Sequence, residues 1–259
     1  MKIATWNVNS LNVRLPHVLD WLQEHKTDVL CLQETKQEDA KFAYQALTDA
    51  GYHAIHNGQK TYNGVAILSR HEMTDVQHGI PGFEDEQKRV ITATIAGIRI
   101  ICAYMPNGQS LESDKYQYKL RWLDALNNWL ALELANHPRL ALLGDYNIAP
   151  EDCDVHDPLA WVGQVLVSEP ERAAFKRMVE LGLHDSFRLF EQAEGSFSWW
   201  DYRMAGFRRN LGLRIDHILV SNALVPDCTA SWIDKVPRKL ERPSDHTPVV
   251  LELNNPLIS

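Results

Sequence analysis

Polar side chains that could bind a metal or move a proton stand at the ends of several short apolar runs in this sequence. The clearest case is the run 140–143, which a glycine connects to Asp145 and Asn147. A short apolar run bounded by glycine is typical of a buried strand, so the two polar side chains should lie where that strand ends. Because Asp145 and Asn147 alternate with the bulky Tyr146, we expect them to face the same side. Polar residues stand in the same way at or inside other apolar runs, namely Asn7, Glu34, Asp216, Asp245 and His246.

These residues offer the ligands that a hard divalent cation prefers. They are carboxylates, amides and one imidazole, whereas thiolates and paired histidines do not occur at the predicted strand ends. This chemistry favours Mg²⁺ or Mn²⁺ over Zn²⁺. His53 and His56 are a weak alternative, because their spacing in a probable strand places the two rings on opposite faces. The candidate metal ligands are Asn7, Glu34, Asp145, Asn147, Asp245 and His246.

Most of these residues also have an ordinary structural explanation. Taken alone, Glu34 or Asp216 is more simply explained as a solvated strand end. The residues before Asp245 and His246 are typical of a polar turn, yet a carboxylate next to an imidazole can bind a cation and keep a proton-carrying group beside it. Tyr104 ends a predicted strand and is equally well explained as a packed aromatic with a free hydroxyl.

The segment 197–214 interleaves aromatic and arginine side chains and contains a single acid, Asp201. Such a mixture is suited to stacking on bases or sugars and to contacting phosphates. A core of aromatics with a solvated arginine face would explain it equally well. A Mg²⁺ site beside a basic aromatic loop is, however, the combination that phosphodiester chemistry requires. The residues concerned are Phe197, Trp199, Trp200, Tyr202, Arg203, Phe207, Arg208, Arg209 and Arg214.

The elements that must position these residues begin with a β-α-β unit. Apolar residues at helical spacing, with Pro16 in the first turn, predict an amphipathic helix over 14–26. The runs 2–7 and 28–34 on either side of it are predicted strands. If the two strands are parallel, Asn7 and Glu34 lie at the same carboxyl edge and can share a ligand.

The rest of the chain mixes helices with consecutive strands. A second helix covers about 42–50 and ends at Gly51, a long helix includes 118–129 and is terminated by Pro138, and a shorter one around 175–179 ends at Gly182. Strands are predicted at 65–68, 90–95, 98–104, 140–143, 213–220, 228–236 and 247–253, with a hairpin turn at 96–97. This order excludes a purely parallel doubly wound sheet. It favours an α/β sandwich of two sheets packed face to face with helices outside, possessing pseudo-symmetric halves, in one domain over 1–259.

Composition limits the classes of function. The chain carries 26 Lys and Arg against 34 Asp and Glu, a net charge of −8, which argues against coating nucleic acid or membrane by bulk charge. Its four cysteines are far apart, so we expect reduced thiols. The sequence contains no motif of P-loop NTPases, serine hydrolases or dinucleotide-binding dehydrogenases. Without a signal peptide or an apolar run that spans a bilayer, we expect a soluble cytoplasmic protein with no membrane partner.

Taken together, the motifs resemble those of the exonuclease III-type apurinic/apyrimidinic (AP) endonucleases of the endonuclease/exonuclease/phosphatase superfamily. The resemblance covers nearly the whole chain, and several ordered motifs at family-like intervals are more specific than any one of them. It implies a four-layered α/β sandwich of two mixed sheets, with the site at one edge of both. The matching segments are 5–9 (TWNVN), 32–36 (LQETK), 62–66 (YNGVA), 104–107 (YMPN), 144–147 (GDYN), 212–216 (GLRID) and 243–246 (PSDH).

The resemblance also implies roles for individual residues. Glu34 would be the principal metal ligand, with Asn7 and Asp245 nearby, while Asp145 and Asn147 would hold or activate the attacking water. His246, oriented by Asp216, would contact the scissile phosphate, and Tyr104 would donate to it. Three residues fall where the family lines its pocket for a base-free sugar, and two fall at DNA-contact positions. The first group is Trp199, Leu213 and Ile215, and the second is Asn107 and Arg203.

The function implied is a Mg²⁺-dependent (or Mn²⁺-dependent) DNA-repair phosphodiesterase. Its substrate would be duplex DNA with abasic sites or with damaged or recessed 3′ ends, and the protein would act as a monomer. The loop 151–170 departs from the family pattern, and a bulkier loop there, together with Leu213, could close the pocket to an internal abasic site. We expect Asp145 and His246 at exposed edges of the site. A phosphatase or phosphodiesterase for a small phosphate ester or phospholipid head group, and a non-catalytic binding module, remain as alternatives.

Overall fold

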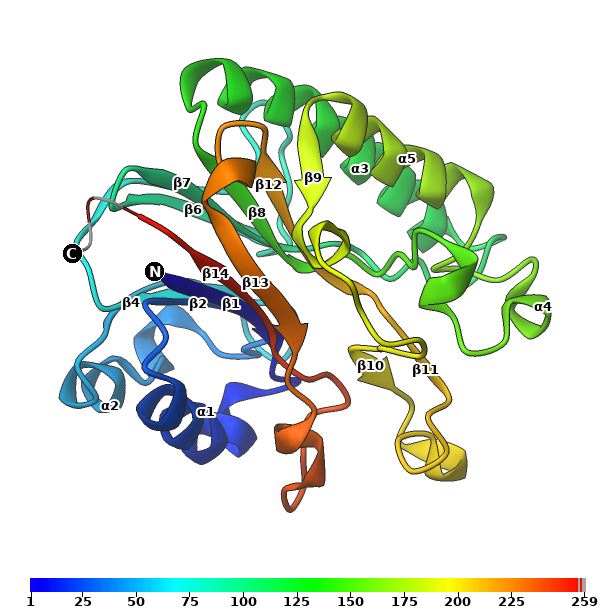
Figure 1. Cartoon of the computed structure of the whole chain (residues 1–259), viewed down its shortest axis with the longest axis horizontal. Helices are drawn as coiled ribbons and strands as arrows, with labels where there is room; N and C mark the ends of the chain where they lie inside the picture. Colours follow the sequence, from blue (N-terminus) through cyan, green and yellow to red (C-terminus); the bar gives the residue numbers. More distant parts are fainter. Residues whose placement is uncertain (256, 258–259) are drawn as a thin grey trace.

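Two six-stranded mixed sheets pack face to face, with helices on their outer faces (Figure 1). The structure is a computed structural model, and it describes residues 1–255 and 257. The helices α1 (Leu11–His25) and α2 (Tyr44–Asp49) lie outside one sheet, and α3 (Asp114–Asn136) and α5 (Glu169–Glu180) lie outside the other. This is the four-layered α/β sandwich that the sequence predicted.

The first sheet is built around the parallel pair β1 (Lys2–Asn7) and β2 (Val29–Gln33). Its strand order is β13-β14-β1-β2-β4-β3, and all other neighbours are antiparallel. The remaining strands are β3 (His53–Asn57), β4 (Val65–Ser69), β13 (Cys228–Ile233) and β14 (Val249–Leu253). Helix α1 joins the central strands, which confirms the predicted β-α-β unit.

The second sheet repeats this plan around the parallel pair β7 (Ile98–Tyr104) and β8 (Leu140–Asp145). Its order is β5-β6-β7-β8-β12-β9, again with antiparallel outer strands. Those strands are β5 (Met73–His78), β6 (Val90–Ile95), β9 (Leu183–Asp185) and β12 (Asp216–Ser221). The predicted hairpin between β6 and β7 turns at Ala96 and Gly97, both with positive φ, as a two-residue turn requires.

Three hydrophobic layers hold the sandwich together. One lies between the sheets and contains buried residues of both, including Cys31, Cys102, Leu143 and Leu251. A second joins the outer face of the second sheet to α3 and α5, and a third joins the first sheet to α1 and α2. All four cysteines are free, as expected. Since the layer between the sheets is shared, the site edge of one sheet is fixed relative to the other.

Side-chain caps start the helices that carry the site loops. Ser113 caps α3, and Ser168 caps α5 in a reciprocal capping box with Glu171. A one-turn helix, α4 (Pro158–Trp161), lies in the connection between β8 and α5. Short 3-10 helices occur at Asp39–Lys41, Asp152–Asp154, Ser186–Leu189, Arg203–Ala205, Val225–Asp227 and Val236–Lys239.

Three predicted elements were wrong in their extent. The strand predicted over 228–236 ends at Ile233, and a 3-10 helix begins at Val236. Helix α1 begins at Leu11, so Pro16 lies inside the helix and not in its first turn. The strand predicted over 213–220 is split between β11 (Gly212–Leu213), which pairs with β10 (Trp199–Trp200), and β12. The split occurs because the backbone N–H of Arg214 donates to Asp154 instead of continuing a sheet ladder. The strands β5, β9 and β10 were not predicted, because they are very short or lack alternating apolar residues.

Among the described residues, no helix has the length and apolarity needed to cross a bilayer.

Candidate active site

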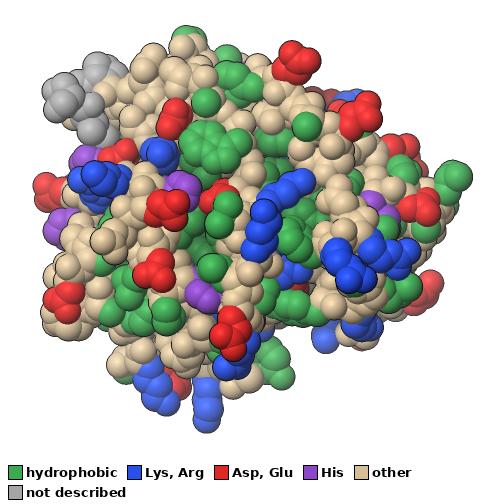
Figure 2. All heavy atoms as spheres, turned by 60° about the horizontal axis from the view of Figure 1, so that its bottom comes forward, with side chains coloured by type: hydrophobic (Ala, Val, Ile, Leu, Met, Phe, Trp, Pro, Cys, Tyr) green, Lys and Arg blue, Asp and Glu red, His purple; other side chains and the backbone are tan. Residues whose placement is uncertain are grey.

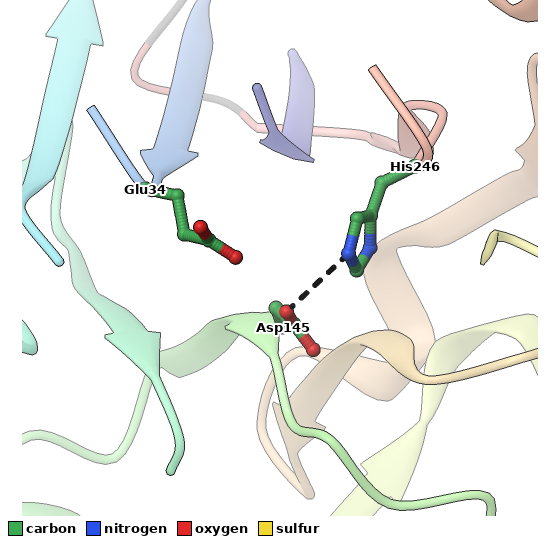
Figure 3. A group of neighbouring side chains, drawn as sticks. All are labelled: Glu34, Asp145 and His246. Carbon is green, nitrogen blue, oxygen red and sulfur yellow. Dashed lines mark ion pairs between the residues drawn. The ribbon is translucent and has the colours of Figure 1, made fainter. Parts of the chain in front are cut away.

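Glu34, Asp145 and His246 converge at one edge of both sheets (Figure 3). Glu34 follows β2, Asp145 ends β8, and His246 lies in the turn before β14. One potential ligand atom from each side chain lies within 4.8 Å of the other two. Both central strand pairs are parallel, and their carboxyl ends meet here. This topology therefore brings together residues that are far apart in the sequence.

Asn7, at the end of β1, bridges the two sheets. Its amide Nδ2 donates to Glu34 Oε1 and to Asp145 Oδ2, both at 2.9 Å. The predicted proximity of Asn7 and Glu34 is confirmed by this contact. Glu34 has a positive φ of 52°, and its other carboxylate oxygen lies 3.0 Å from the ammonium of Lys36. The Glu34 carboxylate is thus aimed into the site by an amide and a cation together.

The segment Asp145 to Asn147 turns sharply after β8. Asp145 Oδ1 accepts the backbone N–H of Asn147 at 2.9 Å, and Asn147 has a φ of 50°. Tyr146 between them is fully buried in the core. The side-chain amide of Asn147 donates to Met105 O and accepts from Asn107, at 2.9 and 3.0 Å. Asn147 therefore fixes the loop behind the Asp145 carboxylate and links it to the loop after β7.

Tyr104, the last residue of β7, donates its phenolic hydrogen to Glu34 Oε1 at 2.9 Å. The guanidinium of Arg89 lies over its ring, 4.7 Å from the centroid. Burial and the nearby carboxylates of Glu34 and Asp145 raise the pKa of Tyr104 well above its ordinary value. Tyr104 is therefore a protonated donor held inside the site, and not a packed aromatic with a free hydroxyl.

His246 is oriented by Asp216, the first residue of β12. The imidazole Nδ1 lies 2.9 and 3.1 Å from the two carboxylate oxygens of Asp216. The hydroxyl of Ser198 donates to Asp216 Oδ2 at 2.7 Å and accepts the backbone N–H of the same residue at 3.1 Å. With Nδ1 bound to Asp216, Nε2 points toward Asp145 Oδ2 at 3.7 Å, as the dashed line in Figure 3 marks.

Burial and nearby charges shift the pKa values of both Asp145 and His246. Burial raises the pKa of Asp145 to about 7; the carboxylates of Asp216 and Glu34 add to the rise, and His246 and Asn7 oppose it. Burial lowers the pKa of His246, but the carboxylates of Asp216, Asp145 and Asp245 outweigh it and raise the value to about 10. At neutral pH the site therefore contains an imidazolium donor beside a carboxyl group poised to exchange a proton.

Asp145 and His246 are far less accessible than the sequence suggested. Their exposed fractions are 1% and 4%, whereas we expected both at exposed edges of the site. The expectation was wrong because the loops after β7 and β8, together with the turn before β14, pack over the strand ends. Polar groups at such a buried edge need partners, and the hydrogen bonds with Asn7, Asn147 and Asp216 supply them.

The donor set fits a hard divalent cation. Two carboxylates and an imidazole meet in one place, and a cation there would offset the negative charge of Asp216 and Glu34, which adds to the rise in pKa that burial causes at Asp145. Asp245 lies apart from this group of three. Its two oxygens accept from Asn9 Nδ2 at 2.9 Å and from Trp199 Nε1 at 3.0 Å. These two donors, with His246, hold the pKa of the Asp245 carboxyl low against the effect of burial.

The residues predicted to line a sugar pocket are buried or partly buried in one apolar cluster. Leu213 and Ile215 are exposed by 0% and 2% and pack with Ala149, Val155 and Leu166. Trp199, Trp161, Val165 and Val167 are partly buried against the same cluster. The loop 151–170 therefore supplies the apolar side chains that cover Leu213 and Ile215, as the expected departure from the family pattern suggested.

Groups that could contact a polyanion surround the site. Asn107 is exposed and lines a groove of about 650 Å³ together with Arg89, Tyr104 and Lys115. Arg203 is highly exposed and pairs with Asp201 at 2.7 Å. On the face seen in Figure 2, Lys and Arg side chains form several separate groups, with acidic and hydrophobic side chains between them.

Several supporting residues were not identified as functional from the sequence. Each of them contacts one predicted site residue: Asn9 contacts Asp245, Lys36 contacts Glu34, Arg89 contacts Tyr104 and Ser198 contacts Asp216. Lys36 lies two residues after Glu34 and could have been suspected from that spacing. For Ser198 and Arg89 the sequence holds no signal, because each meets its partner only through the tertiary fold.

The chain is similar to known proteins over most of its length. Residues 4–246 match the family described as "Endonuclease/Exonuclease/phosphatase family". Exodeoxyribonuclease III of Haemophilus influenzae is 38% identical, covering 97% of this chain and 99% of that protein. A structure of the 3′ phosphatase NExo from Neisseria, bound to product DNA hairpin, superposes with a TM-score of 0.96 at 48% identity over 98% of this chain and 99% of that one. An AP endonuclease from Archaeoglobus fulgidus gives a TM-score of 0.95 at 42% identity, with 98% and 99% coverage.

Proposed function

Because this chain belongs to the endonuclease/exonuclease/phosphatase family, in the branch of exonuclease III and the AP endonucleases, we propose that it is a DNA-repair hydrolase that processes 3′ ends. It is a metal-dependent nuclease with duplex DNA as substrate, and Mg²⁺ or Mn²⁺ is the proposed ion. We further propose that residues 1–259 form one domain and act as a monomer.

The observation that carries 3′-end processing is the covered apolar pocket. Leu213 and Ile215 are almost fully buried in one cluster with Val155 and Leu166, so neither side chain is open to an abasic sugar within a continuous strand. A terminal 3′-phosphate or nucleotide need only reach the strand-end groups. The relative named as a 3′ phosphatase is also the more similar of the two structures compared. Removal of 3′ phosphates, with 3′ to 5′ digestion, is therefore proposed over incision at internal abasic sites.

Glu34 is the proposed principal ligand, with Asn7, Asn147 and Asp245 supporting it, whereas Asp145 and His246, which border the same place, are assigned to proton transfer and phosphate contact. When bound, the cation supplies Lewis-acid polarisation of the phosphoryl oxygen and takes up developing negative charge. Every other task falls to side chains that the fold already orients.

Asp145 is proposed to accept the proton of the attacking water, because burial brings its pKa to about 7, close to the working pH. The Asn147 N–H and the Asn7 amide hold its two oxygens at 2.9 Å. His246, protonated and oriented by Asp216, would donate to a non-bridging phosphate oxygen, and Tyr104 would donate its phenolic hydrogen to the same phosphate. Asn107 and Arg203 would contact the DNA backbone, and Trp199 would flank the terminal sugar.

The test uses three labelled duplexes, each with Mg²⁺ or with EDTA. One duplex carries a 3′-phosphate, one a recessed 3′ end and one an internal abasic site. We expect rapid release of phosphate from the first, slower shortening of the second and little incision of the third, all abolished by EDTA. Asp145→Asn should abolish turnover and keep the wild-type circular dichroism spectrum.

Fast incision of the abasic duplex without 3′-phosphate release would contradict the proposed preference. Hydrolysis of small phosphate esters but of no duplex would contradict the DNA substrate. Near wild-type turnover by Asp145→Asn would contradict the proposed site.

A further inference from the structure

A fully buried ion pair lies directly behind the active-site loops. Lys119 of α3 and Glu171 of α5 form it, and both side chains have an exposed fraction of 0%. Burying an ammonium group is costly unless it is paired and fully hydrogen-bonded. The partners of each charge therefore indicate which parts of the structure the pair holds.

Lys119 holds the loops that follow β7 and β8. Its Nζ donates to the backbone carbonyl of Asn107 at 3.1 Å and to that of Asn147 at 2.7 Å. Asn147 adopts a left-handed backbone conformation with φ 50°, and its N–H contacts the Asp145 carboxylate at 2.9 Å. The ammonium group thus fixes from behind the residue whose N–H positions the catalytic carboxylate, without touching that carboxylate itself.

Glu171 holds a different segment, residues 166–168, which we call the strap. Its Oε1 accepts the backbone N–H of Leu166, and its Oε2 accepts that of Ser168, both at 3.0 Å. The carbonyl of Leu166 accepts the N–H of Ala149 at 2.7 Å. Leu166 has a φ of 76°, which costs energy for a leucine, and its side chain is buried in the same cluster as Leu213 and Ile215. The carboxylate therefore keeps a strained residue in the position that covers the pocket.

We propose that Lys119 and Glu171 are positioning residues with separable tasks. Lys119 sets turnover by fixing the Asn147 loop, and Glu171 sets substrate choice by holding the strap over the pocket. The second task rests on the proposed preference for 3′ ends. The first concerns any reaction that uses Asp145.

The same helix offers a matched control. Arg99 of β7 and Glu133 of α3 form another buried pair, 2.8 Å apart, with exposed fractions of 3% and 7%. Glu133 lies 14 residues beyond Lys119, about 20 Å along the helix axis. Removing one partner of either pair should lower stability. Only the pair behind the site should change kinetic constants per folded molecule.

Lys119→Met and Arg99→Met test the first task. The measurements are kcat and KM on the 3′-phosphate duplex with Mg²⁺, normalised to folded protein from a urea titration. We expect Lys119→Met to lower kcat about 10- to 100-fold with KM nearly unchanged, because a misplaced catalytic group costs this much. Arg99→Met should keep the wild-type kcat. Equal kcat values for the two variants would overturn this assignment.

If Lys119→Met does not fold, the double variant Lys119→Met/Glu171→Gln replaces it. It removes the unpaired buried charge, which is the main source of instability. The same loss of kcat is expected, since the Asn147 carbonyl still lacks its donor. A wild-type kcat in the double variant would overturn the role of Lys119.

Glu171→Gln and Glu133→Gln test the second task. A glutamine amide keeps one oxygen toward Lys119 and the Leu166 N–H and places a donor where Oε2 accepts the Ser168 N–H, so the strap should be released at Ser168 while Lys119 still contacts both carbonyls. We expect the ratio of abasic-site incision to 3′-phosphate release to rise about tenfold or more, the scale on which apolar pockets discriminate. Glu133→Gln should leave the ratio unchanged.

Leu166→Gly provides a second route, because glycine accepts the positive φ and removes the covering side chain. It should raise the same ratio, and an unchanged ratio in both Glu171→Gln and Leu166→Gly would overturn the role of the strap. A wild-type protein that releases no 3′-phosphate would refute the proposed function instead. The effect of Lys119→Met is then measured on whichever duplex the wild type hydrolyses.

Discussion

Replacing Asp216 by asparagine tests how His246 keeps its proton. Asn has nearly the same shape as Asp and can still accept from the hydroxyl of Ser198, which lies 2.7 Å from Asp216 Oδ2. It removes the negative charge that contacts His246 Nδ1 at 2.9 Å. Burial lowers the pKa of His246, and three carboxylates, led by Asp216, raise it from 6.5 to about 10. The substitution therefore removes the strongest support of the imidazolium.

The expected magnitude follows from the geometry. An opposite charge at hydrogen-bonding distance raises a histidine pKa by about 1 to 3 units, or about 1.4 to 4 kcal/mol of preference for the charged form. In Asp216→Asn the pKa of His246 should fall by that amount. At pH 9 kcat should then drop about 10²- to 10³-fold, as when one donor to a developing oxyanion is lost. Below pH 7 the loss should be much smaller, because His246 is then protonated in both proteins.

The sign of the stability effect is also fixed. The pKa of His246 is raised on folding, so its contribution to stability is fully present below pH 6.5 and is lost as pH rises through about 10. The wild type should therefore lose unfolding free energy over this window. In Asp216→Asn this contribution should be smaller, so the free energy of unfolding should change less with pH than in the wild type.

The assay is the pH profile of kcat/KM for 3′-phosphate release, from pH 6 to pH 10 with Mg²⁺. The alkaline limb of the Asp216→Asn profile should move to lower pH by about one pH unit or more. Glu180→Gln, an exposed acid of α5, is the charge-matched control and should follow the wild type. An alkaline limb at the wild-type position in Asp216→Asn would refute the reasoning.

Three further predictions concern Tyr104, Glu34 and His217. Tyr104→Phe loses the hydroxyl that contacts Glu34 and should lower kcat about 10²-fold with an unchanged melting curve; full activity would exclude Tyr104 as a donor. Glu34→Gln should weaken Mg²⁺ binding at least about tenfold by calorimetric titration, and unchanged affinity would place the metal elsewhere. Burial, together with the charge of Arg214, lowers the pKa of His217 to about 4. The contribution of neutral His217 to the free energy of unfolding is therefore fully present above pH 6.5 and is lost as the pH falls through 4. In urea titrations between pH 7 and pH 4, the wild type should lose about 3 kcal/mol of unfolding free energy through this group. His217→Gln should lack that loss, and an equal loss in the variant would contradict the prediction.

Much of the fold followed from local patterns. Apolar runs located the central strands, and the turn at Ala96 and Gly97 was identified because few residues form a two-residue hairpin. The elements that were missed or misplaced lack a local signal. The exposed edge strand β5 has no apolar alternation, and the break before β12 depends on Arg214 meeting Asp154, 60 residues away. Contacts of that kind are set by packing and not by neighbours in the chain.

The sequence by itself determined which polar groups stand at strand ends, and therefore that hard-metal and phosphate chemistry was available. It determined this because strand period and turn chemistry are local properties of the chain. Only the tertiary structure decided that Asn7 joins Glu34 of one sheet to Asp145 of the other. Only the tertiary structure buried Asp145 and His246 and shifted their pKa values, because burial and charge pairing depend on distant segments.

The same holds for substrate choice. The sequence showed that the loop 151–170 departs from the family pattern, but not where its side chains lie. Packing brings Val155 and Leu166 into one buried cluster with Leu213 and Ile215. Packing also sets a buried ammonium and carboxylate, from Lys119 and Glu171, behind the loops that carry the chemistry. Such a pair is stable only where the folded chain supplies all of its hydrogen-bond partners, so no stretch of sequence could reveal it alone.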